Sequence, residues 1–521
     1  MKLILPLFFL LNAVLLPGQH TNVMISDEFN PNEPSIGMDF NNPQNMVAGA
    51  NINAFFYSHD GGLTWTSGVL SSDYGVWGDP TIACDTAGNF YFFHLSNPPS
   101  GNRIDRIVCQ KSLDDGETWS SGSYTGLNGV KVQDKQWVAI DRTNNNIYMT
   151  WTQFDVYNST NPADSSNIMF SKSLDGGLSW SAAKRINTVP GDCVDSDNTT
   201  EGAVPAVGPN GEVYVAWAGP EGLVFDRSMD QGETWLAEDI MVADIPGGWD
   251  YNISGIYRSN GLPVTVCDLS DGPNRGTIYI NWTDQRNGED DTDVWLVKST
   301  DGGDTWSQPI RVNDDAPGNQ QFLTWMAIDQ ITGYLWFVFY DRRNTSGTAT
   351  DVYMAVSEDG GATFRNFKIT DTPFTPVSGV FFGDYTNIVA HNSIVRPIWT
   401  RLDGAELSLW TTIVDTDAAL TDVVEKAQDP VFKKTHNYPN PFTDKTYISF
   451  KLRKEAVVTV NILDLTGKKV TTLVNGEVYP YGKHIIPFDP KAYNLVSGTY
   501  FYTLLINGVL SKNKMIFVGK E

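Results

Sequence analysis

Short apolar segments alternate with polar turns along most of this chain. Segments such as Ile107–Gln110, Ile168–Ser171 and Val352–Val356 are mostly apolar, and each leads into a turn rich in Ser, Asp and Gly. Apolar runs of this length between turn residues are typical of β-strands. No long segment shows the 3.6-residue periodicity of an amphipathic helix. The pattern therefore predicts an all-β protein.

The turns repeat one motif, S-x-D-x-G-x-[T/S]-[W/F], in six copies that lie 54 to 71 residues apart. The Asp carboxylate of such a turn can accept hydrogen bonds from backbone N–H groups, and the Gly can adopt a positive φ. Self-similarity of this kind marks a repeat architecture. We expect a structural role for the six aspartates, which are Asp60, Asp114, Asp175, Asp230, Asp301 and Asp359.

Each repeat is interpreted as four strands, and a seventh unit follows the last copy of the motif. This unit has candidate strands at Thr386–Ala390, Val395–Arg401 and Glu406–Val414 but lacks a fourth. Near the N-terminus, Asn22–Asp27 is similar to the fourth strands of the other units. We expect it to complete the last unit, because that closes a ring and protects two open sheet edges. Seven units are favoured, with six as the alternative.

The repeated motif resembles the Asp-box, or BNR repeat, of the sialidase-like β-propellers. The resemblance implies a seven-bladed, alternatively six-bladed, β-propeller over residues 20–415. It also implies a glycoside hydrolase that acts on terminal sugars of extracellular glycans, so the expected partner is a glycan or glycoprotein.

A second module follows a polar linker at residues 416–430. Its opening His436–Phe442, its turn Asp464–Lys469 and its strand Leu495–Tyr502 resemble the C-terminal sorting domain of type IX secretion. The resemblance implies a small β-sandwich over residues 431–521 that engages the type IX secretion machinery. The protein is then expected to be secreted, or held at the outer-membrane surface, by a Gram-negative bacterium of the Bacteroidetes type.

The termini and the charge agree with export. Residues 1–19 have the form of a signal peptide, with Lys2 before an apolar run, and no other apolar run is long enough to span a bilayer. The net charge of −25 argues against a nucleic-acid partner. Residues 431–521 hold 13 Lys and Arg against 6 Asp and Glu, a balance of +7, which leaves −32 for the rest. The four cysteines lack CxxC spacing, and we expect buried free thiols.

The functional face of a propeller is formed by the residues just before the first strand and just after the second strand of each unit. At these positions the chain places acids, arginines and a tyrosine, a composition suited to a sugar acid or another polar ligand, because arginine binds carboxylates in a bidentate manner. The residues are Asp79, Asp134, Lys135, Glu201, Arg258, Asp284, Arg286, Asp341, Arg342, Arg343, Asp384, Tyr385 and Arg401.

The resemblance to sialidases implies a role for six of these residues. Asp79 is expected to act as acid/base and Tyr385 as nucleophile with Glu201 as its base, while the substrate carboxylate is bound by Arg286, Arg342 and Arg401. Sialidases also carry an arginine in an F/Y-R-I-P motif of the first blade. The matching stretch here, Asn32–Ser35, holds no arginine, and Arg401 or Arg258 is the candidate to replace it.

Two other functions stay open at this level. One is a non-catalytic surface propeller that binds glycan or protein. The other is a glycosidase for polysaccharide that uses two carboxylates drawn from Asp79, Glu201 and Asp384. No cofactor is expected. The acidic loop Glu289–Asp293 and the group Asp192, Asp195 and Asp197 offer hard oxygen ligands for Ca²⁺ but lack EF-hand spacing, and the six histidines show no zinc-site spacing.

Overall fold

The computed structural model describes residues 20–101, 103–420, 432–452, 455–465, 468–506 and 509–519. The expected signal peptide lies outside these residues. The chain divides into two compact units, Met1–Thr421 and Asp422–Glu521, which are described separately. No helix in the described part of the chain is long and apolar enough to cross a membrane.

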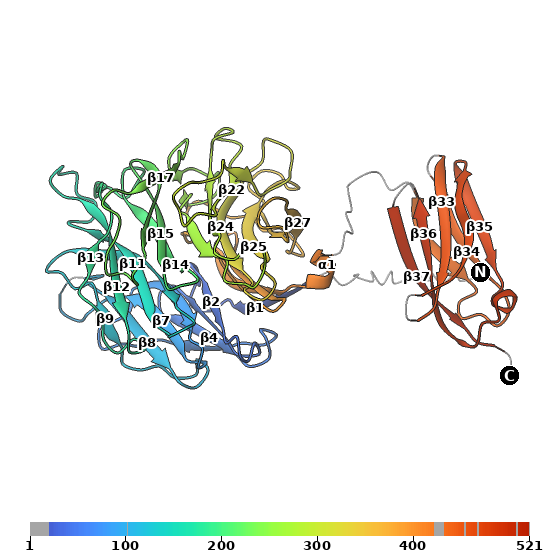
Figure 1. Ribbon diagram of the computed structural model, residues 1–521, viewed down its shortest axis with the longest axis horizontal. Helices are drawn as coiled ribbons and strands as arrows, with labels where there is room; N and C mark the ends of the chain where they lie inside the picture. The colour runs from blue at the N-terminus through green and yellow to red at the C-terminus, as the bar shows by residue number, and fades with distance from the viewer. Residues whose placement is uncertain are drawn as a thin grey trace, which may run out of the picture. The chain divides into compact units, whose positions relative to one another are not determined.

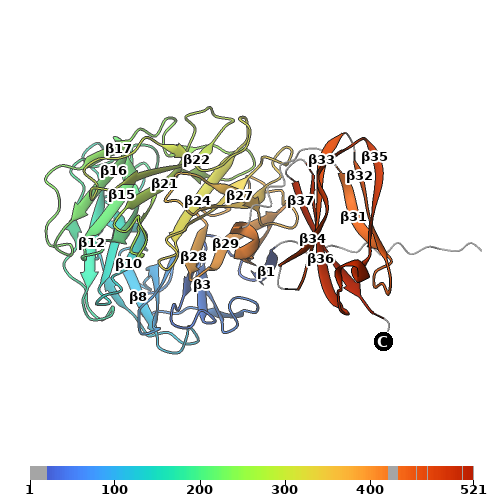
Figure 2. The same cartoon turned by 45° about the vertical axis from the view of Figure 1, so that its right-hand side comes forward.

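The first unit is built from four-stranded antiparallel sheets that follow one another along the chain, from blue through green and yellow to orange (Figures 1 and 2). The first four are β2–β5 (Ser35–Met38, Met46–Ala50, Ala54–Ser58, Thr66–Val69), β6–β9 (Gly78–Cys84, Phe90–Leu95, Ile107–Ser112, Ser123–Thr125), β10–β13 (Val132–Ile140, Ile147–Phe154, Ser166–Ser173, Lys184–Arg185) and β14–β17 (Glu201–Val207, Val213–Gly219, Gly222–Ser228, Ile240–Ala243).

Three further sheets complete the unit, which gives seven in its described residues, one for each unit counted in the sequence. They are β20–β23 (Val264–Cys267, Ile278–Asp284, Asp293–Ser299, Ile310–Arg311), β24–β27 (Gln321–Ile328, Leu335–Asp341, Asp351–Ser357, Arg365–Lys368) and β28–β30 (Asn387–His391, Ile394–Asp403, Glu406–Ile413) with β1 (Thr21–Ser26). A short hairpin, β18 (Asp250–Tyr251) and β19 (Ser259–Asn260), precedes β20.

The sheets close into a ring through their first strands. Each first strand contacts the first strand of the next sheet, and β28 contacts β2. The last sheet takes its fourth strand from the N-terminus, as the sequence predicts, because β1 pairs antiparallel with β30 from Thr21 opposite Ile413 (Figure 1). The first strands thus surround the axis of the ring, and residues at their starts can meet there.

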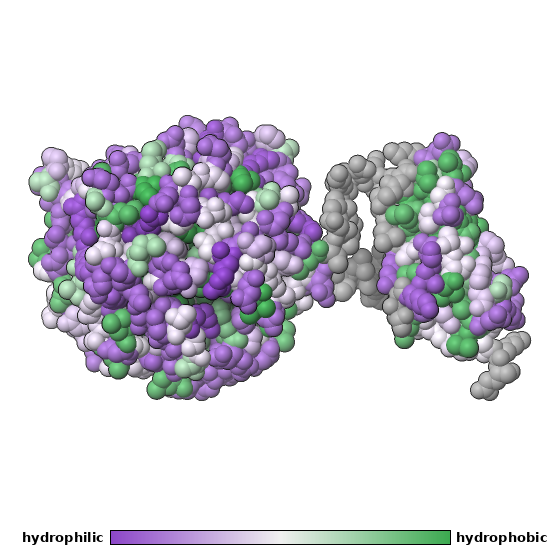
Figure 3. Space-filling view, viewed as in Figure 1, coloured by the Kyte–Doolittle hydropathy of each residue, from purple (hydrophilic) through white to green (hydrophobic). Residues whose placement is uncertain are grey.

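The core lies between neighbouring sheets and is rich in aromatic side chains. Five second strands each bury one tryptophan completely: Trp151, Trp217, Trp282, Trp336 and Trp399. Burial of such large side chains is the main favourable contribution to folding. The outer surface is largely hydrophilic on the side that Figure 3 shows. The four cysteines are free, as the sequence predicts, although Cys84 is only half-buried.

The six motif turns share one hydrogen-bond network. In the first copy, the Ser58 and Thr64 hydroxyls donate to the two oxygens of Asp60, at 2.8 and 2.6 Å, and the Gly62 N–H donates to Ser58 Oγ at 2.9 Å. The other five copies repeat these bonds. Hydrogen bonds from Thr234 lower the pKa of Asp230 to about 2. The aspartates therefore close turns.

The second unit is a β-sandwich, the class that the sequence predicts. One sheet has the order β31 (Phe432–Tyr438), β32 (Thr446–Leu452), β35 (Gly482–Phe488), and the other has the order β34 (Lys469–Tyr479), β33 (Ala456–Leu463), β36 (Gly498–Ile506), β37 (Val509–Phe517). Both sheets contribute to one apolar core. The expected linker 416–430 begins with a short helix, α1 (Thr416–Leu420), and residues 421–430 lie outside the described part.

Candidate functional site at the axis

The first strands share an irregularity near their starts. The pairing register shifts between Gly78 and Thr81 in β6, and the same shift recurs in β10, β14 and β24. Such bulges redirect side chains and are common beside active sites. At them Asp79, Lys135 and Leu323 have φ values near +50°, and Glu33 has the same conformation before β2. Residues other than glycine adopt it at a cost of about 1–3 kcal/mol, and such strain gathers at functional sites.

Three carboxyl groups from consecutive sheets meet at the axis. Asp79 lies close enough to both Glu33 and Asp134 to interact with them electrostatically. The Asn51 amide donates to Glu33, and the N–H of Asp79 donates to Asn51 Oδ1 at 2.8 Å, which fixes the group. Burial, followed by the charge of Asp79, holds the pKa of Glu33 well above its usual range. Burial likewise raises the pKa of Asp134 to about 8, so Asp134 carries a proton at neutral pH.

A fourth carboxyl group, Asp384, is ionised and held by two cations. Lys135 Nζ lies 2.7 Å from Asp384 Oδ2, and Arg258 donates from Nε to Oδ1 at 2.7 Å and from Nη2 to Oδ2. The Asp384 side chain is 1% exposed. Although burial alone would raise it, the pKa of Asp384 lies well below its ordinary value because of Lys135 and Arg258. Lys135 therefore lies close to a protonated carboxyl group, Asp134, and to an ionised one, Asp384.

Glu201, the first residue of β14, is buried beside this cluster. It is 1% exposed, and among the described residues neither of its carboxyl oxygens has a hydrogen-bond partner. Burial and then the charge of Asp195 keep its pKa well above the usual range. A buried carboxyl group without a partner is costly when ionised, so burial favours the neutral form of Glu201.

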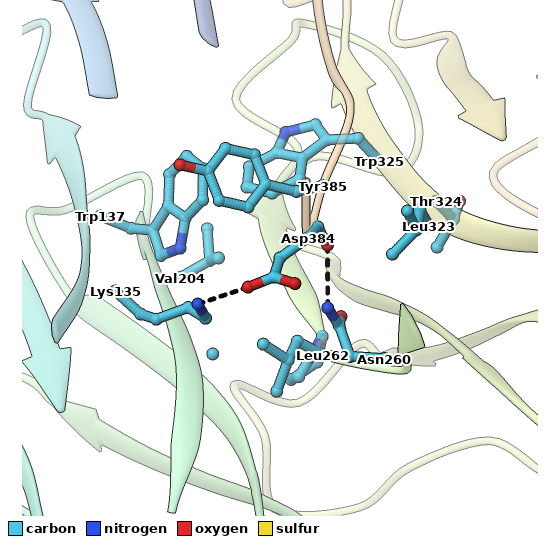
Figure 4. A pocket seen from close by; sticks show the side chains of 12 residues that line it. Lys135, Trp137, Val204, Asn260, Leu262, Leu323, Thr324, Trp325, Asp384 and Tyr385 are labelled. Carbon is cyan, nitrogen blue, oxygen red and sulfur yellow. Dashed lines mark hydrogen bonds and ion pairs between the residues drawn. The ribbon is translucent and has the colours of Figure 1, made fainter. Parts of the chain in front are cut away.

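Aromatic and aliphatic side chains line the cavity together with Lys135 and Asp384. Tyr385 packs edge-on against Trp137, with ring centroids 5.0 Å apart, and Trp325 lies 4.3 Å from Trp137 (Figure 4). Leu262 and Leu323 lie across from them (Figure 4). The cavity that these groups enclose with Lys135 and Asp384 has a volume of about 20 Å³, which is room for about one water.

Two connecting segments pack together beside Asp384. Arg258, between β18 and β19, stacks over Phe381 at 5.2 Å, and its Nη1 lies 3.7 Å from Asp195 Oδ2. From the connection after β11, Tyr157 donates its hydroxyl hydrogen to the same Asp195 oxygen. The Arg258 side chain is 39% exposed, whereas the Asp384 side chain that it binds is 1% exposed.

The structure gathers the expected Asp79, Glu201 and Tyr385 around Lys135, but the three expected arginines make other contacts. Arg286 pairs with Asp284 at 2.6 Å and lines a separate hollow of about 350 Å³ with Asp244 and Trp306. Arg342 donates to Thr350 Oγ1 at 3.1 Å and stacks over Phe322. Arg401 pairs with Asp403 at 2.7 Å.

The physical reason lies in strand order. Arg286, Arg342 and Arg401 follow or end second strands, whereas the first strands surround the axis. Glu33 is a site residue that the sequence interpretation missed. The available signal was the similarity of Asn32-Glu33-Pro34-Ser35 to Gly78-Asp79-Pro80-Thr81, since both carry an acid before Pro at the start of a first strand.

No group of three or more His, Cys, Asp or Glu in the described residues is placed to hold a metal ion. In the acidic loop, Asp291 accepts a hydrogen bond from the Gly318 N–H at 2.6 Å, and Asp293 accepts from Asn313. Asp197 accepts from the Asp250 N–H at 2.8 Å. These carboxylates thus bind the protein's own donors.

Two family models match the chain. The model of the BNR/Asp-box repeat matches residues 56–67, and the model of the secretion system C-terminal sorting domain matches residues 436–518. No curated protein matches.

Solved structures of similar fold include two sialidases and a lyase. A Hadza microbial sialidase is 15% identical over 70% of this chain and 72% of its own, with a TM-score of 0.41. A sialidase of Streptococcus pneumoniae is 11% identical over 71% and 83%, with a TM-score of 0.42. An ulvan lyase is 12% identical over 70% and 88%, with a TM-score of 0.43. The chain thus carries a BNR/Asp-box repeat and a secretion system C-terminal sorting domain, and the sorting domain indicates secretion or attachment to the outer-membrane surface.

Proposed function

We propose that the first unit is a glycoside hydrolase that cleaves extracellular glycans with the carboxyl groups at its axis. The observation that supports this best is the difference between two neighbours of Lys135. Burial raises the pKa of Asp134 to about 8, whereas Lys135 and Arg258 keep Asp384 ionised. Titratable groups with pKa values driven apart are the usual basis of acid and base roles.

Glycoside cleavage uses both states. A protonated carboxyl group can donate its proton to the leaving-group oxygen, and a carboxylate can stabilise the positive charge that develops on the sugar ring. In this proposal Asp134 is the proton donor, Asp384 supplies the negative charge, and Trp137 and Tyr385 offer an apolar wall to a sugar ring. Because the cavity measures about 20 Å³, it must widen to admit a sugar ring.

The test is hydrolysis of a panel of fluorogenic glycosides by the full chain and by Asp134→Asn. The panel includes arabinofuranoside, glucoside, glucuronide and sialoside. Loss of a general acid costs about 10²- to 10⁴-fold in rate, and we expect a loss in that range for Asp134→Asn on the substrate that the parent cleaves. Hydrolysis that survives in Asp134→Asn would refute the role of Asp134. A panel without any turnover, combined with measurable glycan binding, would favour a non-catalytic binding propeller.

A sialidase is the second candidate, and the position of Tyr385 favours it. Tyr385 is 7% exposed, and its pKa is raised by burial and then by the charges of Asp79 and Glu33. A carboxylate close to the hydroxyl could accept its proton as it attacks. One observation argues against a sialidase. Arg258 is hydrogen-bonded to Asp384 through two of its donor groups, which are then not free to bind a substrate carboxylate. Cleavage of the sialoside that is lost in Tyr385→Phe would establish this candidate.

A further inference from the structure

The second unit exposes an ordered set of side chains on its three-stranded sheet. In β32, Ile448, Phe450 and Leu452 are buried in the core. Because side chains alternate along a strand, the residues between them lie on the outer face. Tyr447 on this face is 47% exposed, and Lys451 is exposed as well.

The strand register assembles these residues into rows. Tyr438 lies opposite Tyr447, and Tyr447 lies opposite Pro487. Ile485 lies opposite Ser449, and Lys483 lies opposite Lys451. Tyr438 is 75% exposed and Ile485 is 53% exposed. We call these residues the tyrosine face: it is apolar at one end and basic at the other, and it comprises Tyr438, Tyr447, Ile485, Pro487, Lys451 and Lys483.

The outer face of the four-stranded sheet carries a different apolar row, in which Val457, 46% exposed, lies opposite Val478 and Leu463 lies opposite Phe501. It exposes Val478 and Leu505, but Thr459 lies opposite Leu505 and Asn461 lies opposite Thr503. The Thr472 hydroxyl also donates to Asn461 Oδ1 at 2.7 Å. Both outer faces therefore expose apolar side chains. The exposed tyrosines Tyr438 and Tyr447 distinguish the tyrosine face, since Tyr500 and Tyr502 of β36 are buried.

We propose that the tyrosine face is the surface by which the secretion machinery recognises this sorting domain, and that its partner is a protein surface with an apolar pocket beside acidic side chains. Residues 436–518 match a sorting domain, and a sorting domain acts by binding a partner protein that recognises it. Exposed tyrosines with apolar neighbours are typical of protein interfaces. Residues 431–521 carry 13 Lys and Arg against 6 Asp and Glu, so an acidic partner is electrostatically favoured.

The experiment compares export of the full chain in a bacterium that has the type IX machinery. Tyr438→Ser combined with Tyr447→Ser removes the apolar row, and Lys451→Glu combined with Lys483→Glu reverses the charge. Immunoblots of the periplasm and of the medium with the cell surface measure where the first unit accumulates. We expect both double variants to retain it in the periplasm, with at least a tenfold smaller exported fraction than the parent.

The matched control is Val478→Ser combined with Leu505→Ser, on the other sheet, which we expect to be exported like the parent. Thermal unfolding of each purified full-chain variant shows whether the second unit still folds, since every substituted side chain is exposed. Export of both tyrosine-face variants at the parent level would overturn the proposal. An equal export defect in the folded control would overturn it as well, because the defect would then not belong to one face.

Discussion

The two ends of each sheet in the first unit obey different rules. At one end, six copies of the Asp-box turn hold the same Ser, Asp, Gly and Thr or Ser side chains in the same hydrogen bonds, as Asp60 and Asp230 illustrate. At the axial start of the first strands, one structural position holds Glu33, Asp79, Lys135 or Leu323, all with positive φ. The Asp-box turn is thus repeated in amino-acid sequence, whereas the axial position is repeated only in its backbone conformation.

The difference distinguishes residues that stabilise the fold from residues that can take part in catalysis. A turn that every repeat needs keeps its side chains, because each copy solves the same folding problem. The axial position is occupied once per sheet around a single centre, so each copy can carry a different group. The cationic Lys135 and the apolar Leu323 line the cavity, and the carboxyl groups of Glu33 and Asp79 lie close to Lys135. We infer that activity depends on the axial residues and stability on both sets.

The largest loss of unfolding free energy is expected from Asp384→Ala. Removal of this carboxylate leaves the buried Lys135 ammonium, 7% exposed, without its partner and also releases Arg258. Breaking a buried ion pair in this way costs about 3–5 kcal/mol. Urea unfolding of the parent and the variant measures the loss. An unfolding free energy equal to that of the parent would mean that the Lys135–Asp384 pair contributes nothing.

A rise in pH should lower stability and then remove activity through Asp134. Its pKa rises from 3.8 to about 8 on folding, so in this interval the folded protein holds a proton that the unfolded chain has released. The stability that this group contributes therefore falls as pH rises from 3.8 to about 8. The rate of hydrolysis should fall above pH 8, where the proton donor is lost. Rate and unfolding profiles from pH 5 to pH 9 test this, and Asp134→Asn should flatten the unfolding profile.

A smaller loss of unfolding free energy is expected from Asp60→Ala, in the Asp-box turn at the other end of the sheet. The side chain accepts bonds from Ser58 and Thr64 at the surface, and the loss of such bonds costs about 1 kcal/mol. The same substitution at Asp114 or Asp175 should cost a similar amount, and none should change the rate of hydrolysis at saturating substrate. A change in rate from one copy alone would contradict the separation of scaffold from chemistry.

The smallest effect is expected from Arg401→Gln. Arg401 pairs with Asp403, whose side chain is 55% exposed, and exposed ion pairs contribute less than about 1 kcal/mol. The substrate contact proposed for Arg401 from the sequence would instead raise KM for an acidic substrate. Steady-state kinetics on glucuronide and sialoside decide between these outcomes, with Arg258→Gln as the comparison at the axis.

Much of the fold can be predicted from the sequence because its signals are local. The Asp-box letters specify turns, and the apolar stretch Asn22–Asp27 indicates the closing strand that the structure pairs with β30. The site is less predictable. Glu33 reaches the axis through a left-handed backbone conformation before β2, which leaves a weak trace in Asn32–Ser35. The pairing of Arg286 with Asp284 depends on side-chain direction at the end of β21, which an amino-acid pattern does not encode.

The most direct test is a single assay of glycoside hydrolysis with the parent, Asp134→Asn and Asp60→Asn side by side. The account predicts a loss of about 10²-fold or more in kcat for Asp134→Asn, since a general acid is removed, and parent-like kcat for the folded Asp60→Asn. Equal losses in the two variants, or full activity in Asp134→Asn, would contradict the claim that the chemistry resides where the repeats differ.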